Sequence, residues 1–270
     1  MRLLRTSLLA LALAPAALVA APAQPAAPAF DSSIISGLGA RNIGSAAMSG
    51  RISSLDAVTL PDGKLMVWVG AASGGVWKSL DGATTFTPVF DDQPVQSIGA
   101  VEIDKRNTET VWVGTGEAWT RNSVSIGNGI YKTTDGGDTW QHLGLDGSER
   151  ISDIRIDPRA SDTVYACVTG RLWSDSLERG VYRTRDGGQT WQQVLKAPNA
   201  STGCASLSMD EKNPDVLYAA LWDFRRKGWT FRSGGDSPTA PSASALMLTR
   251  DGGRTWNEVT PGQNKGFAQK

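Results

Sequence analysis

The segment TRDGGQTW, residues 184–191, decides the fold, because the chain repeats it in nearly the same form three more times. The other copies are SLDGATTF (79–86), TTDGGDTW (133–140) and TRDGGRTW (249–256). Their aspartates are 54, 51 and 65 residues apart: Asp81, Asp135, Asp186 and Asp251. A repeat of about 50 residues indicates a tandem array of supersecondary units.

Each repeat contains four short β-rich runs, which we name strands A to D in chain order. In the third repeat they are RISDIRID (150–157), TVYACVTG (163–170), GVYRT (180–184) and WQQVL (191–195). Alternating apolar residues, β-branched side chains and Gly, Asp and Pro at the breaks favour strands over helices. Four-stranded units in tandem are typical of a β-propeller. The sequence therefore predicts an all-β fold with four visible blades, at about residues 50–90, 95–145, 149–196 and 202–260.

The repeated segment resembles the Asp-box (BNR) repeat, S/T-x-D-x-G-x-T-W, and would form the turn between strands C and D. Three copies match that pattern throughout, and the first departs from it at Ala83 and Phe86. We expect the aspartate to accept hydrogen bonds across the turn, and glycine to take a positive φ. The final aromatic residue, as in Trp140, Trp191 and Trp256, would pack in the core. This role is structural, and calcium would need more oxygen ligands than one box offers, so no metal is predicted.

The first 23 residues have the layout of a secretory signal peptide. Arg2 and Arg5 precede an uncharged apolar run at residues 8–20, and APA at 21–23 fits the small-x-small cleavage rule. Residues 24–39 follow as a Pro/Ala linker, 40–260 as the propeller and 261–270 as a tail. We expect an exported protein, periplasmic or extracellular, with no membrane span once the signal is removed.

Charge and composition exclude several classes of function. The chain has 27 basic and 27 acidic residues, which argues against a nucleic-acid partner bound by phosphate neutralisation. The sole histidine, His142, excludes a multi-His metal site, and its position in strand D directly after a box argues against catalysis. Cys167 and Cys204 come from different blades, where we expect different depths; they either form a disulfide or stay as two buried thiols. No cofactor is predicted.

The loops between strands B and C are the predicted ligand-binding regions. They are long in the last three repeats, at residues 116–129, 169–180 and about 222–243. Each combines tryptophan with arginine, and the candidate ligand-binding residues are Trp119, Arg121, Trp173 and Trp222. Trp faces stack on sugar rings or peptide side chains, and Arg binds carboxylates. In the structural alternative, these tryptophans fold back over the propeller.

Aligned strands A place four residues at one repeat position near the central channel: Arg51, Ser97, Arg150 and Gly203. Arg51 and Arg150 are therefore candidates for binding one anionic group. The competing interpretation is ordinary ion pairing with nearby Glu117 or Asp153.

The boxes, the blade pattern and the signal peptide together resemble bacterial relatives of the sortilin/Vps10 N-terminal propeller, over about residues 40–260. Chains of this kind are often labelled glycosyl hydrolases, and the wider class includes sialidases, xyloglucan-cleaving enzymes and peptide-binding receptors. The Arg-Ile-Pro start of sialidases is replaced by RIS at residues 51–53, which argues against that activity. The resemblance implies a longer protein, so we expect these blades to need further blades from a longer chain and to form part of a larger propeller.

Three functions remain open from the sequence. The first is recognition, in which the loop face between strands B and C binds a glycan or an extended peptide. The second is glycoside hydrolysis, which needs two carboxylates that face one bond. The candidates are Glu117, Asp153 and Asp223, which we assign to loops, and their spacing singles out no pair. The third is a passive assembly scaffold.

Overall fold

The computed structural model describes residues 51–235 and 241–259, all within the compact unit Arg41–Lys270. The predicted signal peptide, linker and tail lie outside the described residues. Where the chain is described, no helix has both the length and the apolar character that crossing a bilayer requires.

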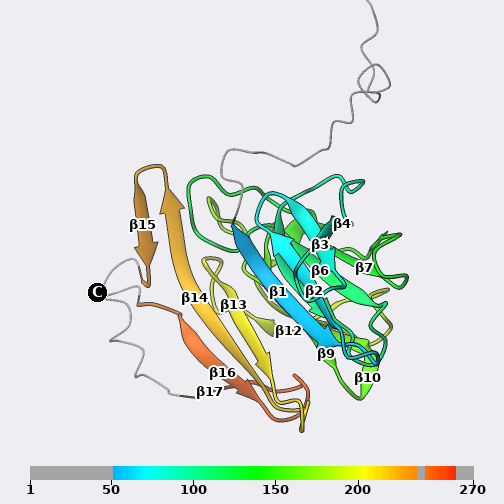
Figure 1. Cartoon of the computed structure of the whole chain (residues 1–270). Helices are drawn as coiled ribbons and strands as arrows, with labels where there is room; N and C mark the ends of the chain where they lie inside the picture. The colour runs from blue at the N-terminus through cyan, green and yellow to red at the C-terminus, as the bar shows by residue number, and fades with distance from the viewer. Residues whose placement is uncertain (1–50, 236–240, 260–270) are drawn as a thin grey trace, which may run out of the picture. The chain divides into compact units, whose positions relative to one another are not determined.

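The described residues form four antiparallel sheets, which we number blades 1 to 4 (Figure 1). Each has four strands in chain order, and the fourth sheet has one additional strand. Blade 1 contains β1 Ile52–Thr59, β2 Leu65–Ala71, β3 Gly75–Ser79 and β4 Thr87–Pro88. Blade 2 contains β5 Ile98–Ile103, β6 Val111–Thr115, β7 Ile130–Thr133 and β8 Gln141–His142. Blade 3 contains β9 Ile151–Asp157, β10 Ala160–Val168, β11 Gly180–Thr184 and β12 Gln192–Lys196, preceded by the short turn η2 Asp146–Ser148. Blade 4 contains β13 Thr202–Met209, β14 Leu217–Lys227, β16 Ala245–Thr249 and β17 Asn257–Glu258, with β15 Thr230–Ser233 paired to β14.

Blade 4 departs from the predicted loop between its strands B and C. β14 continues to Lys227 and pairs with β15, which gives a hairpin that extends beyond β13 and β16 in Figure 1. The assignment of Trp222 and Asp223 to a loop is therefore wrong. Both lie in β14, opposite Gly203 and Thr202 of β13.

Strand A of every blade contains a β-bulge at the same position. In each blade, the pairing of strand A with strand B shifts register once. The shift follows directly after one of four equivalent residues: Ile52, Ile98, Ile151 and Cys204. Arg51, Ser97, Arg150 and Gly203 each precede one of these residues, so they occupy one structural position, as the aligned sequences predict. Successive inner strands contact one another, from β1 to β5, β9 and β13.

The hydrophobic core lies between successive blades. One cluster joins Trp68 and Phe90 of blade 1 to Ile98 and Tyr131 of blade 2. Two further clusters join blades 2 and 3, and blades 3 and 4, in the same way. Middle strands such as β6 are therefore covered on both faces, which explains their continuous apolar runs.

The aromatic residue of an Asp-box fastens its blade to the preceding one. Trp140 of the second box packs edge-on against Trp68, with 6.2 Å between ring centroids, and donates its Nε1–H to Val89 O at 2.6 Å. Trp191 repeats this with Trp112, also at 6.2 Å, and with a carbonyl of blade 2 at 2.8 Å. These two indole rings thus bury apolar surface and place their N–H groups on acceptors in the neighbouring blade. Trp256 of the fourth box also packs against the core between blades 3 and 4, but its Nε1–H has no hydrogen-bond partner among the described residues.

A disulfide between Cys167 of β10 and Cys204 of β13 links blade 3 to blade 4. Both residues are fully buried, and their Cα atoms are 5.2 Å apart. The expectation that they lie at different depths is therefore wrong. The chains approach closely here: a Cβ on Gly203 would lie 2.1 Å from Thr169 O, so glycine is required.

Removal of this disulfide should destabilise the interface between blades 3 and 4. The bridged cysteines are 37 residues apart in sequence, for which loop-closure entropy gives roughly 4 kcal/mol. We expect the double variant Cys167→Ala, Cys204→Ala to unfold at a lower urea concentration than the oxidised wild type. Reductant should lower the midpoint of the wild type and leave that of the variant unchanged. Equal midpoints for the two oxidised proteins would contradict this prediction.

Candidate functional site

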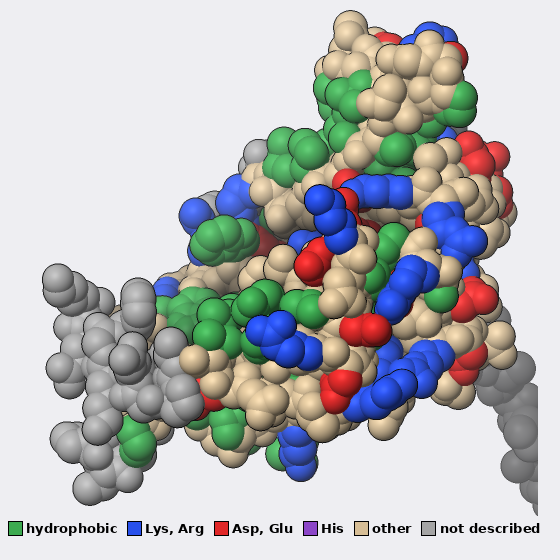
Figure 2. Space-filling model, turned by 90° about the horizontal axis from the view of Figure 1, so that it is seen from below, with side chains coloured by type: hydrophobic (Ala, Val, Ile, Leu, Met, Phe, Trp, Pro, Cys, Tyr) green, Lys and Arg blue, Asp and Glu red, His purple; other side chains and the backbone are tan. Residues whose placement is uncertain are grey.

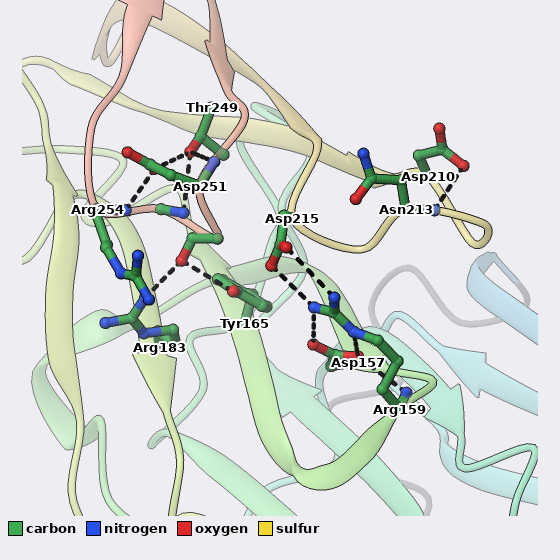
Figure 3. Close-up of polar contacts among 12 residues, drawn as sticks. Asp157, Arg159, Tyr165, Arg183, Asp210, Asn213, Asp215, Thr249, Asp251 and Arg254 are labelled. Carbon is green, nitrogen blue, oxygen red and sulfur yellow. Dashed lines mark hydrogen bonds and ion pairs between the residues drawn. The ribbon is translucent and has the colours of Figure 1, made fainter.

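The Asp-boxes share one hydrogen-bond pattern, and Figure 3 shows the contacts of Asp251 with Thr249 and Arg254 in the fourth box. In the third box, Thr184 Oγ1 donates to Asp186 Oδ1 at 2.7 Å and accepts from Gly188 N–H at 2.9 Å. The same carboxylate accepts hydrogen bonds from the N–H and the hydroxyl of Thr190. Both carboxylate oxygens are thus used within the turn. In the part of the chain that the structure describes, no three His, Cys, Asp or Glu side chains gather as metal ligands.

The preceding blade also donates hydrogen bonds to the main chain of the second and fourth boxes. Lys78 Nζ donates to Gly136 O at 3.0 Å, and in Figure 3 Tyr165 donates its hydroxyl hydrogen to Gly252 O, also at 3.0 Å. Beside that box, Arg159 bridges Asp157 and Asp215 at 2.8 and 2.9 Å. Charged groups of both signs are interspersed on the face shown in Figure 2. The polar groups near the boxes therefore hold the turns and the blades together.

The loops between strands B and C lie at the opposite ends of the strands and expose three tryptophans. Trp119 in loop 116–129 is 64% exposed, Trp173 in loop 169–180 is 49% exposed, and Trp229 in the β14–β15 turn is 100% exposed. Arg121 is exposed in the same loop as Trp119. Successive blades thus present aromatic side chains to solvent from the same end of their strands.

Trp222 differs from these three residues, because it packs within the β14–β15 hairpin. Its ring lies 5.1 Å from that of Phe224 and 5.5 Å from that of Phe231. Its Nε1–H donates to Ser233 Oγ at 2.7 Å. These contacts stabilise the hairpin, and the ring is half-buried.

Arg51 and Arg150 occupy equivalent positions but pair with different carboxylates. Arg51 Nε donates to Glu117 Oε1 at 2.9 Å, and a second bond joins Nη2 to Oε2. Arg150 is 1% exposed, and its Nη1 donates to Glu149 Oε2 at 3.0 Å. Burial lowers the pKa of Arg150 below its usual value, and the negative charges of Glu149 and Glu117 offset this effect only in part. The structure therefore shows ion pairs at this repeat position.

Asp153 lies in strand β9, so its assignment to a loop is wrong. Its Oδ1 pairs with Arg155 Nη2 at 2.8 Å, and its Oδ2 accepts from Leu207 N–H of blade 4 at 3.0 Å. Burial raises its pKa. Glu102 of β5 pairs with Arg155 Nη1 at 3.1 Å, and burial raises the pKa of Glu102 to about 8. Sequence reasoning missed Glu102 and Arg155, although charged residues within strands A were the available signal.

Glu117 and Asp223 are fully buried. Asp223 accepts hydrogen bonds from Ser201 Oγ at 2.7 Å and Ala243 N–H at 3.2 Å, and pairs with Arg232 at 3.3 Å. Each of the three candidate catalytic carboxylates pairs with an arginine: Glu117 with Arg51, Asp153 with Arg155 and Asp223 with Arg232. The structure thus singles out no catalytic pair.

Comparisons with known proteins agree with this architecture. Residues 182–193 match the family model described as BNR/Asp-box repeat. An oligoxyloglucan-reducing end-specific xyloglucanase of Emericella nidulans is 25% identical over 239 residues, which cover 74% of this chain and 27% of that enzyme. The chain therefore spans about a quarter of the length of this relative.

Solved structures show the same fold. A GH74 enzyme of Niastella koreensis matches with a TM-score of 0.51 at 21% identity, over 72% of this chain and 27% of that one. An ancestral GH74 enzyme matches with a TM-score of 0.58 at 18% identity, over 80% and 26% of the two chains. The chain thus has an all-β, β-propeller-type fold built from Asp-box repeats. The closer resemblance to the sortilin/Vps10 propeller stays a prediction.

The Asp-box carboxylates should make stability depend on acid pH. Hydroxyl and backbone hydrogen bonds lower the pKa values of Asp81, Asp135 and Asp186 from 3.8 to about 2, and lower that of Asp251 as well. A depressed pKa stabilises the folded state above pH 4, and this contribution is lost as pH falls from about 4 to about 2. We expect Asp186→Asn to lower the urea midpoint at pH 7, and the difference from wild type to shrink through that window.

The matched control is Asp138→Asn, which removes an equal charge from an exposed box residue outside this hydrogen-bond pattern. Its urea midpoint should follow that of the wild type at every pH. A difference for Asp186→Asn that stays constant between pH 4 and pH 2 would refute the assigned role of the carboxylate.

Proposed function

We propose that this chain is part of the glycan-binding face of a glycoside hydrolase-like β-propeller that is exported from the cell. The observation that carries the proposal is the exposure of Trp119, Trp173 and Trp229 on the B–C connections of three successive blades. A tryptophan on a loop gains nothing in packing when it faces water, and loops on a rigid scaffold commonly carry function. Flat indole faces are suited to stacking on sugar rings.

Hydrogen bonds at their bases support two of these loops. Gly127 N–H donates to Glu149 O at 2.8 Å, which ties loop 116–129 to blade 3. Arg179 Nη2 donates to Ser174 O at 3.2 Å inside loop 169–180. Anchored loops lose less conformational entropy when a ligand binds, which favours affinity.

The similarity to a xyloglucanase favours a glycan over an extended peptide as the ligand. We therefore expect a β-glucan of the xyloglucan type to bind across the tryptophans. A peptide ligand, or a scaffold that binds no small ligand, is an alternative result of the experiment below.

Hydrolysis is the second candidate function, and the same similarity supports it. A general acid must keep its proton near neutral pH, and burial raises the pKa of Asp153 in that direction. Asp153, Glu117 and Asp223 all pair with arginines, so substrate binding would have to displace an arginine or a second catalytic carboxylate would come from elsewhere in a longer protein. Recognition is favoured over hydrolysis because Trp119, Trp173 and Trp229 are already exposed to a ligand.

Loss of either loop tryptophan should weaken glycan binding. We expect Trp119→Ala and Trp173→Ala each to reduce affinity for a xyloglucan oligosaccharide about tenfold or more, as removal of a central aromatic anchor does. Isothermal titration calorimetry measures the affinity, and a reducing-end assay on the same samples detects turnover.

The matched control is Ile126→Ala, because Ile126 is 54% exposed in the same loop as Trp119. Its affinity should equal that of the wild type. Unchanged affinity in both tryptophan variants would rule out the proposed face. If the wild type instead releases reducing ends and Asp153→Asn does not, hydrolysis is the function that the result supports.

The outer faces of blades 1 and 4 support a larger propeller. On blade 1, Ile52 is 63% exposed, whereas Ile98 and Ile151 at equivalent positions of the next blades are fully buried. On blade 4, Tyr218 is 39% exposed, whereas the equivalent Trp112 is fully buried. Each outer face therefore exposes side chains that, at equivalent positions of the inner blades, are buried against a neighbouring blade. Further Asp-box blades would cover both faces in the larger propeller, as neighbouring repeats do in other arrays.

The mature chain on its own should therefore self-associate as its concentration rises. Phe86 of blade 1 is 39% exposed and stands where Trp140 and Trp191 contact the preceding blade. We expect Phe86→Asp and Tyr218→Asp together to reduce this association at least tenfold, because a buried unpaired charge is unfavourable. Trp229→Asp, on the loop face, should leave it unchanged. Analytical ultracentrifugation measures the association. A monomer at all concentrations with one cooperative unfolding transition would indicate four blades that need no partner.

A further inference from the structure

A small pocket opens between two connections on the same face as the exposed tryptophans. It has a volume of about 210 Å³ and lies between loop 169–180 and the connection from β12 to β13. Two of its lining side chains are basic, Arg179 and Lys196, and none is acidic. The pocket therefore has a positive lining, which favours a negatively charged ligand.

Arg179 is buried without a neutralising carboxylate. Its side chain is 1% exposed, and it forms no ion pair with any residue that the structure describes. Nη1 donates to Thr169 O at 2.8 Å, and the guanidinium carbon lies 4.7 Å from the centre of the Phe224 ring. These contacts fix the orientation of the guanidinium group. No carboxylate among the described residues forms an ion pair with it, and the negative charges of Asp175 and Asp223 act on it only from farther away. A buried cation in this state is unfavourable, and a bound anion would relieve that cost.

The nearest acidic residues are already paired. Asp175 pairs with Arg225, and Asp223 pairs with Arg232 at 3.3 Å. Burial is the main cause that lowers the pKa of Arg179 to about 10, and the positive charge of Arg225 lowers it further. Arg179 thus stays positively charged at neutral pH.

Two buried polar atoms at this place have no hydrogen-bond partner: Ser176 Oγ and Arg179 Nε. A Cβ on Gly170 would lie 3.0 Å from the first and 3.2 Å from the second, so both border the same small region. Unsatisfied buried polar groups are uncommon in native proteins, and a bound ion or water accounts for many of them. Lys196 is exposed beside this region, where its ammonium group is free to move toward a ligand.

We propose that this pocket binds the carboxylate of an acidic sugar residue, such as a uronate, in the glycan ligand. This inference rests on the proposed glycan-binding function and adds a charged substituent to it. A carboxylate accepts hydrogen bonds from Arg179 Nε and Ser176 Oγ, and pairs with Lys196. The volume is below the roughly 300 Å³ of sites for drug-sized ligands, which suits one sugar unit. Trp173, in the same loop as Ser176, would stack on a neighbouring sugar.

Methyl glucuronide and its neutral counterpart, methyl glucoside, test the proposal on the full mature chain. We expect the glucuronide to bind at least tenfold more tightly in an NMR or calorimetric titration. Lys196→Gln should weaken glucuronide binding at least fivefold. Lys212→Gln removes an equal charge from an exposed turn between β13 and β14, and should leave binding unchanged. Arg179→Lys keeps the positive charge but loses the planar guanidinium group with its fixed N–H directions. This variant, if it folds, should also bind the glucuronide more weakly.

The result separates this proposal from the proposed function. Lys196→Gln should not alter the affinity for a neutral xyloglucan oligosaccharide, which depends on Trp119 and Trp173. Equal affinity for glucuronide and glucoside, or equal effects of Lys196→Gln and Lys212→Gln, would overturn the carboxylate site. Binding of N-acetylglutamate in preference to the glucuronide would overturn it too, since the pocket would then select an acidic peptide.

Discussion

The contact between an Asp-box tryptophan and the aromatic side chain of the preceding blade is the interaction on which this structure depends. A single four-stranded sheet buries neither of its faces, so each blade is stable only against a neighbour. Trp140 on Trp68 and Trp191 on Trp112 provide that neighbour, and each indole N–H also reaches a carbonyl across the interface. The carboxylate hydrogen bonds of the box place the tryptophan at the correct end of the sheet.

The two ends of the blades consequently have different roles. At the Asp-box end, the hydroxyl and carboxylate groups of the boxes are used in hydrogen bonds that fix the turns. At the other end, the B–C connections differ in length and sequence from blade to blade, because blade packing does not constrain them. Exposed tryptophans and the buried, unneutralised Arg179 occur at that end. Rigid repeats thus carry variable loops, which is how many folds acquire binding sites.

The strands and the Asp-box turns were predictable because they depend on local chemistry that recurs four times. The equivalence of Arg51 and Arg150 followed from the same repetition. The long β14–β15 hairpin was not predictable, because an insertion rich in Gly, Arg and Trp has the composition of a loop. The Cys167–Cys204 bridge and the surroundings of Arg179 depend on how two blades or two loops approach. Such distances are not contained in the spacing of residues along one chain.

Phe86 gives the first blade a different kind of edge from blades 2 and 3. Trp140 and Trp191 each need a carbonyl at one place in the blade before them, which fixes the register of the joint. A phenyl ring has no N–H, so Phe86 adds no such hydrogen bond toward a neighbour on that side. At this edge the box aromatic therefore adds apolar contact without setting the register, which depends instead on contacts between inner strands, of the kind that Ser54 Oγ makes with Val101 N–H.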